Sequence, residues 1–90
     1  MKILKFFGTW CNPCKALAKA FEEAKIEHQD IEVDDNEELA DKYHVKSVPT
    51  VIVLDNEGEE LGRFVGPRTK EQLLEELKNY EIQSSEKDNL

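Results

Sequence analysis

Two cysteines, Cys11 and Cys14, are the residues of this 90-residue chain whose type and spacing could carry out redox chemistry. Side chains three residues apart on a helical turn are neighbours, with roughly 5–6 Å between their Cβ atoms, so a small adjustment brings two sulfurs into bonding range. Pro13 lies between them and suits the first turn of a helix, where its missing N–H would have had no partner. The spacing therefore predicts a reversible Cys11–Cys14 disulfide at the start of a helix.

The two sulfurs are expected to play different parts in such chemistry. Cys11 would lie where unpaired backbone N–H groups and the helix dipole favour negative charge, so its thiolate is the predicted nucleophile. Cys14 lies one turn further in and is expected to be more buried, which suits the resolving thiol that attacks a mixed disulfide. Pro13 would stiffen the loop and limit backbone rearrangement between the two redox states. A separate reductant would then restore the dithiol.

A zinc half-site or a pair of inert thiols is the structural alternative. Structural zinc takes four ligands, and the sequence has no second cysteine pair. His28 and His44 lie in other segments without ligand spacing, so no metal site and no bound cofactor is expected. Two cysteines this close cannot join distant loops, and in a reducing compartment such a pair is more often catalytic or metal-binding than structural.

The segments around the cysteines are typical of a strand, a helix and a second strand. Lys2–Phe7 is nearly apolar throughout, as in a strand covered on both faces, and Gly8 and Thr9 interrupt it. Apolar residues then recur at helical spacing over residues 13–24, and His28–Val33 has the pattern of a strand. This order predicts a right-handed parallel crossover with the cysteines at the first strand-to-helix junction.

The second half of the chain predicts a helix, a β-hairpin and a final helix. Two capping-box patterns mark the helix starts: Asp35 with Glu38, and Thr69 with Gln72. Between the helices, the β-prone runs Thr50–Leu54 and Glu60–Val65 flank turn residues and predict an antiparallel hairpin. The expected fold class is therefore α/β in the order β-α-β-α-β-β-α, a four-stranded mixed sheet with helices on both faces.

Composition predicts one domain over residues 1–82 and a disordered polar tail over residues 83–90. Charged residues make up 36% of the chain, above the roughly 25% of ordinary domains. The net charge of −8 argues against nucleic acid or an anionic membrane as the partner. No apolar run is long enough to span a membrane, and Ile3–Phe7 is too short for a signal peptide. A cytoplasmic monomer is expected.

The sequence from Lys2 to about Tyr80 resembles the thioredoxin family through three motifs. Trp10-Cys11-Asn12-Pro13-Cys14 is similar to the family's Trp-Cys-Gly-Pro-Cys. Ser47-Val48-Pro49-Thr50 matches the segment that holds the family's cis-proline, and Val65-Gly66 matches the loop that completes its substrate groove. The resemblance implies a cis Val48–Pro49 peptide beside the cysteines and an exposed Trp10 at the lip of the groove.

The resemblance implies a thiol–disulfide oxidoreductase that acts as a protein-disulfide reductase and electron carrier. The implied substrate-binding residues are Trp10, Val48, Pro49, Val65 and Gly66, and the implied electron donor is an NADPH-dependent thioredoxin reductase. A glutaredoxin-like, glutathione-dependent reductase stays open because the chain is short. However, Gly66-Pro67-Arg68-Thr69 replaces the Gly-Gly and acidic residues with which glutaredoxins hold the tripeptide. A non-catalytic binding module also stays open, since a fold does not imply a function.

The chain departs from the family pattern at four points. It starts after the strand and helix that begin full-length thioredoxins, and Asn12 replaces a glycine, which is expected to tune the redox properties of the cysteines. Lys5 stands where the family has a buried aspartate, and Asp30 stands where that aspartate's lysine partner would be. These two departures suggest a charge-swapped pair beneath Cys14, whose ammonium would stabilise the Cys14 thiolate. The alternative is a Lys5 side chain that reaches out to solvent.

Overall fold

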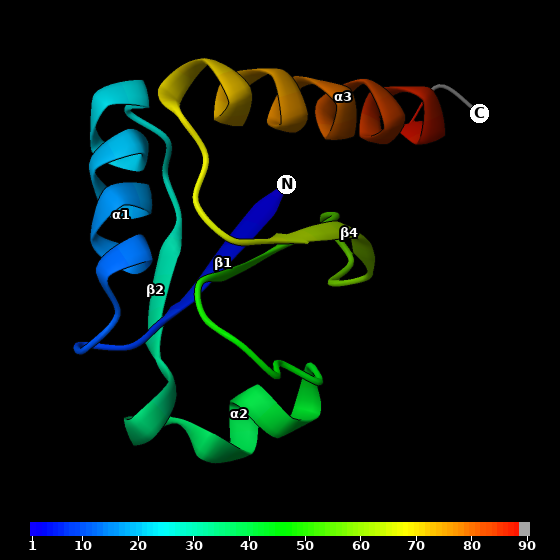
Figure 1. Ribbon diagram of the computed structural model, residues 1–90. Helices are drawn as coiled ribbons and strands as arrows, with labels where there is room; N and C mark the ends of the chain where they lie inside the picture. The colour runs from blue at the N-terminus through cyan, green and yellow to red at the C-terminus, as the bar shows by residue number, and fades with distance from the viewer. Residues whose placement is uncertain (89–90) are drawn as a thin grey trace.

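A four-stranded mixed sheet forms the centre of the fold (Figure 1). The computed structural model describes the backbone of residues 1–88 and the side chains of residues 1–80. Its strands, in the spatial order β2-β1-β3-β4, are β1 (Lys2–Phe7), β2 (Gln29–Glu32), β3 (Thr50–Leu54) and β4 (Glu60–Val65). β1 runs parallel to β2 and antiparallel to β3, and β3 pairs antiparallel with β4. The predicted α/β class and mixed sheet are confirmed.

Helices cover both faces of this sheet, as predicted. The helices are α1 (Asn12–Ala24), α2 (Glu37–Lys42) and α3 (Lys70–Asp88), and the short 3-10 helix η1 (Val33–Asp35) precedes α2. In Figure 1, α3 and α2 lie on opposite sides of the strands. Within the described part of the chain, no helix combines the length and apolar character needed to cross a lipid bilayer.

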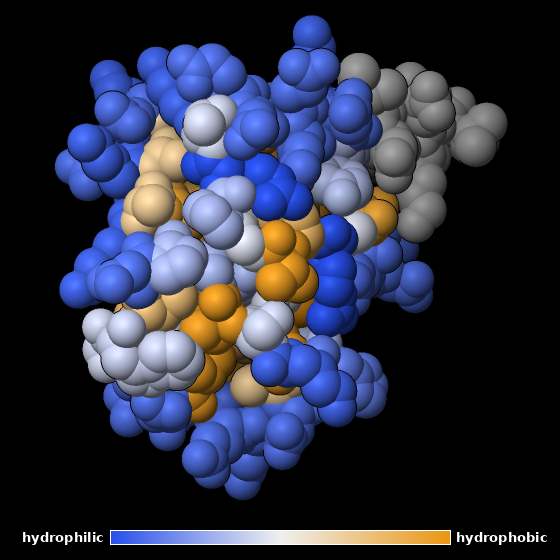
Figure 2. Space-filling view, in the orientation of Figure 1, coloured by the Kyte–Doolittle hydropathy of each residue, from blue (hydrophilic) through white to orange (hydrophobic). Residues whose placement is uncertain are grey.

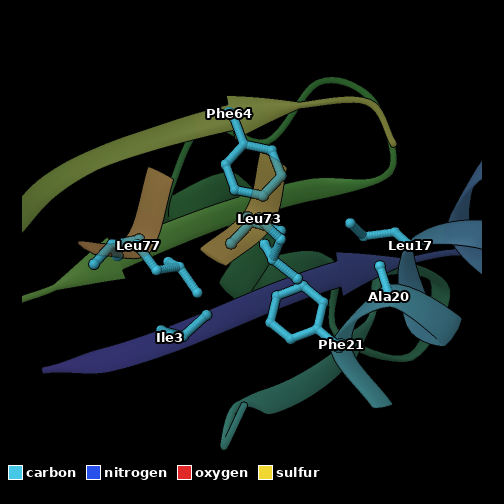
Figure 3. Packing of buried hydrophobic residues seen from close by; sticks show 9 residues of the cluster. Ile3, Leu17, Ala20, Phe21, Phe64, Leu73 and Leu77 are labelled. Atoms are coloured by element: carbon cyan, nitrogen blue, oxygen red, sulfur yellow. The ribbon is translucent and has the colours of Figure 1, made fainter. Parts of the chain in front are cut away.

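Two apolar clusters, one on each face, hold the sheet to its helices. Strand β3 supplies both, because successive side chains of a strand point to opposite faces. Val51 and Val53 face the cluster under α1 and α3, whereas Ile52 and Leu54 face the cluster under α2. Figure 3 shows the first cluster, in which the labelled side chains of α1 and α3 point toward those of β1 and β4. Each fully buried aliphatic side chain contributes about 1.5–3 kcal/mol to the hydrophobic stabilisation.

The surface is dominated by polar side chains. Figure 2 shows hydrophilic residues over most of the face drawn there, with hydrophobic residues gathered near its middle. This distribution agrees with a chain in which 36% of the residues are charged.

One of the two predicted capping boxes forms and the other does not. Thr69 N–H donates to Gln72 Oε1 at 3.0 Å, and Gln72 N–H donates to Thr69 Oγ1 at 3.2 Å. The box predicted from Asp35 and Glu38 is wrong, because α2 begins at Glu37 and no side chain caps it. The Glu32 carboxylate accepts the Asp34 N–H at 2.9 Å instead, so the chain first turns as η1.

The last helix is longer than composition indicated. α3 continues to Asp88, where an unstructured tail was predicted from Gln83. The segment from Lys70 to Asp88 contains neither glycine nor proline, so nothing in it interrupts helical hydrogen bonding. The tail prediction also covers residues 89–90, which lie outside the described residues, and the domain boundary at residue 82 stays a prediction.

Candidate active site

The two cysteines lie at the junction between β1 and α1. Cys11 is the N-cap of α1, with φ −96° and ψ 110°, and Pro13 lies in the first helical turn. The turn after β1 is closed by the Cys11 N–H, which donates to the carbonyl of Gly8 at 3.2 Å. Cys11 and Cys14 form the predicted disulfide, with their Cα atoms 5.2 Å apart.

The Cys11 sulfur accepts a backbone hydrogen bond from the helix. The Cys14 N–H points at Cys11 Sγ at 3.1 Å, so one of the helix's unpaired donors already faces this sulfur. Cys11 Sγ also lies 3.8 Å from the carbonyl oxygen of Val48. A disulfide sulfur has no proton to donate, so this second approach is a contact that a Cys11 thiol could convert into a hydrogen bond.

The expected difference in burial between the cysteines is wrong. Both residues are 4% exposed. They differ instead in their surroundings, because Cys11 faces the Val48 carbonyl whereas Cys14 lines a cavity together with Lys5 and Asp30. The N-cap position of Cys11 favours a thiolate at this sulfur. Cys11 therefore remains the expected nucleophile, although the two cysteines are equally buried.

The segment around Val48 and Pro49 lies beside the disulfide, as the resemblance implied. The Val48–Pro49 peptide is cis, as the resemblance implied, and Pro49 is buried. The Gly66 N–H donates to the Pro49 carbonyl at 2.9 Å, which ties the loop after β4 to this segment. Gly66 has φ 98°, a left-handed conformation that favours glycine. The structure thus brings three of the predicted groove residues close to Cys11.

Trp10 is the exposed aromatic next to the disulfide, with 66% of its surface accessible. Its indole Nε1 donates to Asp34 Oδ2 at 3.3 Å, and its ring lies against Gly8, where a Cβ would come within 2.9 Å of the indole. Asp34 was not singled out from the sequence, because its contact with Trp10 joins residues 24 positions apart.

Lys5 and Asp30 form the predicted charge-swapped pair. They are register partners in the parallel β1–β2 ladder, and Lys5 Nζ lies 3.0 Å from Asp30 Oδ1. The Lys5 side chain is only 6% exposed, which rules out the alternative that it reaches out to solvent. Lys5, Asp30 and Cys14 line one cavity of about 310 Å³, so the pair lies behind the second cysteine.

His28 belongs to the same cluster and was missed in the sequence. Its Nε2 lies 3.0 Å from Asp30 Oδ1, and its ring contacts Phe21 with 4.3 Å between ring centroids. The available signal was spacing, because residues two apart in an extended segment point to the same side. A histidine two positions before Asp30 could therefore have been tested as a partner of that carboxylate.

The described residues offer no grouping of three or more His, Cys, Asp or Glu side chains that could hold a metal ion. The pKa shifts that stand out belong to β4. Hydrogen bonds from Arg63 lower the pKa of Glu60, and the same contact raises the pKa of Arg63. The redox group that the structure contains is the Cys11–Cys14 disulfide.

Known proteins match the chain across most of its length. The Thioredoxin family model matches residues 1–79. Thioredoxin of Staphylococcus epidermidis is 40% identical over 83 residues, which cover 86% of this chain and 79% of that protein. Thioredoxin of Staphylococcus aureus is 36% identical over 83 residues, with the same shares covered.

Solved structures agree with the family match. The reduced thioredoxin pre-protein of Schistosoma mansoni superposes with a TM-score of 0.75 at 35% identity, covering 87% of this chain and 76% of that one. Thioredoxin 1 of Thermosipho africanus superposes with a TM-score of 0.69 at 30% identity, covering all of both chains. Because the family model matches residues 1–79, relatives named thioredoxin are 36–40% identical and the cysteines of this chain form a Cys11–Cys14 disulfide, this chain belongs to the thioredoxin family and is a thioredoxin-type thiol–disulfide oxidoreductase.

Proposed function

We propose that the protein reduces disulfide bonds in other proteins, with Cys11 as the nucleophile and Cys14 as the resolving thiol. The supporting observation is the hydrogen bond from the Cys14 N–H to Cys11 Sγ at the N-cap of α1. A donor and a helix dipole already aimed at this sulfur stabilise a thiolate there once the disulfide is opened.

The reaction then proceeds in two exchanges that balance sulfur for sulfur. The Cys11 thiolate attacks one sulfur of the substrate disulfide, which forms a mixed disulfide and releases the other substrate sulfur as a thiolate. Cys14 loses its proton and attacks Cys11 Sγ, which releases the second substrate sulfur and leaves the Cys11–Cys14 disulfide. The substrate gains two electrons and two protons, and the protein dithiol supplies both electrons.

Five residues around Cys11 are proposed to hold the substrate: Trp10, Val48, Pro49, Val65 and Gly66. Trp10 and Val65 are exposed apolar side chains, which is unusual on a surface this rich in charge. The Val48 carbonyl lies 3.8 Å from Cys11 Sγ, so an extended substrate segment that places a disulfide on Cys11 also meets this backbone.

Four residues are proposed to tune the cysteine pair: Lys5, Asp30, Asn12 and Pro13. Lys5 places a buried ammonium on the cavity that Cys14 lines, where a positive charge stabilises the thiolate formed during resolution. Asp30 balances part of that charge through its 3.0 Å contact with Lys5. Pro13 restrains the first turn between the sulfurs, and Asn12 occupies the exposed position beside it.

The proposed setting is a cytoplasmic monomer that an NADPH-dependent thioredoxin reductase returns to the dithiol form. No bound cofactor is needed, because the dithiol itself carries the two electrons. The net charge of −8 disfavours nucleic acid and anionic membranes as partners, which leaves disulfide-containing proteins as substrates.

The test is reduction of a protein disulfide with two alternative electron supplies. We expect turnover with NADPH and thioredoxin reductase, and little with glutathione and glutathione reductase. Cys11→Ser should abolish turnover, and Cys14→Ser should accumulate mixed disulfides because they cannot be resolved. Turnover that depends on glutathione would favour the glutaredoxin-type alternative, and full biological activity of Cys11→Ser would favour a binding module.

A further inference from the structure

One oxygen of Asp30 is shared by two nitrogen-bearing side chains. Asp30 Oδ1 lies 3.0 Å from Lys5 Nζ and also 3.0 Å from His28 Nε2. A carboxylate oxygen that accepts from both divides its charge between them, so a change at either partner alters its hold on the other. The extent to which Asp30 neutralises the Lys5 charge therefore depends on whether His28 also binds Asp30.

The His28 ring is held so that its protonation state affects Asp30. Its Nδ1 lies 2.8 Å from the Ile26 carbonyl oxygen, and its face contacts the Phe21 ring. The Ile26 carbonyl and the Asp30 carboxylate are both acceptors, so the ring satisfies the two contacts together only when both nitrogens carry protons. Loss of one proton leaves a nitrogen lone pair facing an oxygen, and one of the two contacts is lost.

These contacts lead from His28 to the second cysteine. Lys5 and Asp30 line the cavity of about 310 Å³ that Cys14 also lines, and Lys5 Nζ lies 5.3 Å from the centroid of the Phe21 ring that supports His28. With a neutral His28 the three side chains carry no net charge, and with a protonated His28 they carry one positive charge. A single proton on His28 thus changes the net charge behind Cys14 by one unit.

Other charged groups border this cluster without replacing His28. The charged side chains on α1 and in the loop before β2 are all exposed: Lys15, Lys19, Glu22, Glu23, Lys25 and Glu27. Of these, Lys15 lines the same cavity. Within the described residues, none of them forms a salt bridge with Lys5, Asp30 or His28. Histidine is the side chain that ordinarily changes its charge between pH 5 and 8, so His28 is the member of the cluster suited to respond there.

We propose that His28 is a positioning residue for the dithiol reaction, because through Asp30 it sets how strongly the Lys5 charge acts on Cys14. The role of His28 rests on the proposed function of Lys5 and Asp30. When Cys14 releases its proton to attack Cys11, the new thiolate draws Lys5 Nζ and leaves more of Asp30 to His28. The dithiol form, in which Cys14 can ionise, therefore favours a protonated His28 more than the disulfide form, which has no ionisable sulfur.

Thermodynamic linkage makes this coupling reciprocal. If the dithiol form binds more protons at His28, raising the pH disfavours the dithiol and favours the disulfide. Taken by itself, the His28 proton makes the protein a stronger reductant on the alkaline side of the His28 titration, whereas ionisation of the Cys11 thiol favours the dithiol as the pH rises. Each unit of difference between the His28 titration midpoints of the two redox forms changes the dithiol-to-disulfide ratio tenfold.

NMR titration of the histidine ring protons tests the coupling on the unaltered protein. We expect the His28 midpoint to be higher in the dithiol form than in the disulfide form. His44 is the internal control, since it is exposed and forms no contact with this cluster, and its midpoint should be the same in both forms. A His28 midpoint that does not change with redox state, or that is lower in the dithiol form, would overturn the proposal.

Equilibration with dithiothreitol between pH 5.5 and 7.5 tests the reciprocal effect. The exchange converts one dithiol into another, so its equilibrium depends on pH only through groups on the protein that titrate, and these include the Cys11 thiol. We expect His44→Gln to respond to pH as the unaltered protein does, and His28→Gln to shift further toward the dithiol as the pH rises, because it lacks the opposing contribution of His28. The same pH dependence in His28→Gln as in the unaltered protein would contradict the assignment, and thermal unfolding confirms that the variant is folded.

Lys5→Met separates the two levels of the proposal. If Cys14 reactivity does not change in Lys5→Met, the tuning role of Lys5 fails and the role of His28 fails with it. If Lys5→Met alters Cys14 reactivity but the His28 midpoint is the same in both redox forms, only the role of His28 fails.

Discussion

At the scale of single residues, the site consists of two sulfurs whose environments differ in charge rather than in depth. Cys11 receives a backbone N–H at 3.1 Å, and Cys14 lines the cavity that holds the Lys5 ammonium. A buried charge acts over several ångströms more strongly than the same charge in water, and both the Lys5 and the Cys14 side chains are buried. Lys5 is therefore the residue whose replacement should change Cys14 without changing the disulfide geometry.

Lys5→Met should slow alkylation of Cys14 at neutral pH. In a Cys11→Ser background, where Cys14 is the only thiol, loss of the ammonium is expected to slow the reaction about tenfold, equivalent to one pKa unit of thiolate stabilisation. The measurement is the iodoacetamide rate as a function of pH. Lys15→Met is the matched control, because Lys15 is an exposed lysine on the same cavity. Equal effects from the two substitutions would show that the buried position of Lys5 has no special role.

At the scale of elements, the beginnings of the helices show where local sequence decides the structure and where it does not. Thr69 and Gln72 form the reciprocal cap that their spacing predicts. Near α2, Glu32 takes the Asp34 N–H and Asn36 Nδ2 donates to the Glu32 carbonyl at 2.9 Å. These contacts form η1 first, so the helix begins two residues after Asp35.

Thr69→Ala should destabilise the protein and Asp35→Ala should not. Loss of the Thr69 cap is expected to lower the free energy of unfolding by about 1 kcal/mol. Asp35 is exposed and caps no helix, so its replacement should change that free energy by less than about 0.5 kcal/mol. Urea unfolding of the two variants measures the difference. A larger loss in Asp35→Ala than in Thr69→Ala would contradict the assignment of the caps.

The Glu60–Arg63 pair on β4 should add a small stability that depends on pH. Its hydrogen bonds lower the pKa of Glu60, so the stabilisation is present above the carboxyl's unfolded value of 4.5 and is lost as the pH falls through the folded pKa. The pair is partly exposed, and such pairs contribute roughly 0.2–1 kcal/mol. Arg63→Gln should lower the unfolding free energy at pH 7 and leave it unchanged near pH 2. A deficit that persists in acid would show that Arg63 acts through packing instead.

At the scale of the whole molecule, α3 completes the core on which the site is built. Leu73 and Leu77 pack against β1, β3, β4 and α1 in the cluster that Figure 3 shows. Helix α1, whose first turn carries Cys11 and Cys14, lies against α3 on this face of the sheet. The position of the disulfide therefore depends on residues near the far end of the chain.

Leu73→Ala should be strongly destabilising, and its neighbour Leu74→Ala should be nearly neutral. Leu73 is 0% exposed, and truncation of a buried leucine costs about 2–5 kcal/mol. Leu74 is 43% exposed and leaves no buried cavity when it is shortened. Thermal or urea unfolding of the two variants provides the comparison. Similar losses from both would mean that α3 is not seated on the sheet as described.

Local sequence determined the redox pair, the α/β order and most strand bounds, because those features depend on spacing and side-chain periodicity. Lys2–Phe7, Thr50–Leu54 and Glu60–Val65 are strands with the predicted ends. The pairing of Lys5 with Asp30 could also be predicted from the sequence, because it follows from the positions of the two residues in adjacent strands.

Only the tertiary structure decided which side chains share a charge and how deeply each is buried. The equal burial of Cys11 and Cys14 and the contact from Trp10 to Asp34 both depend on segments that the chain brings together by folding. Near α2, Glu32 accepts the Asp34 N–H and the chain turns as η1 in place of the cap that Asp35 and Glu38 had indicated. Local propensity sets what a segment can form, but hydrogen bonds and charges are settled by whichever partner the folded chain places within reach.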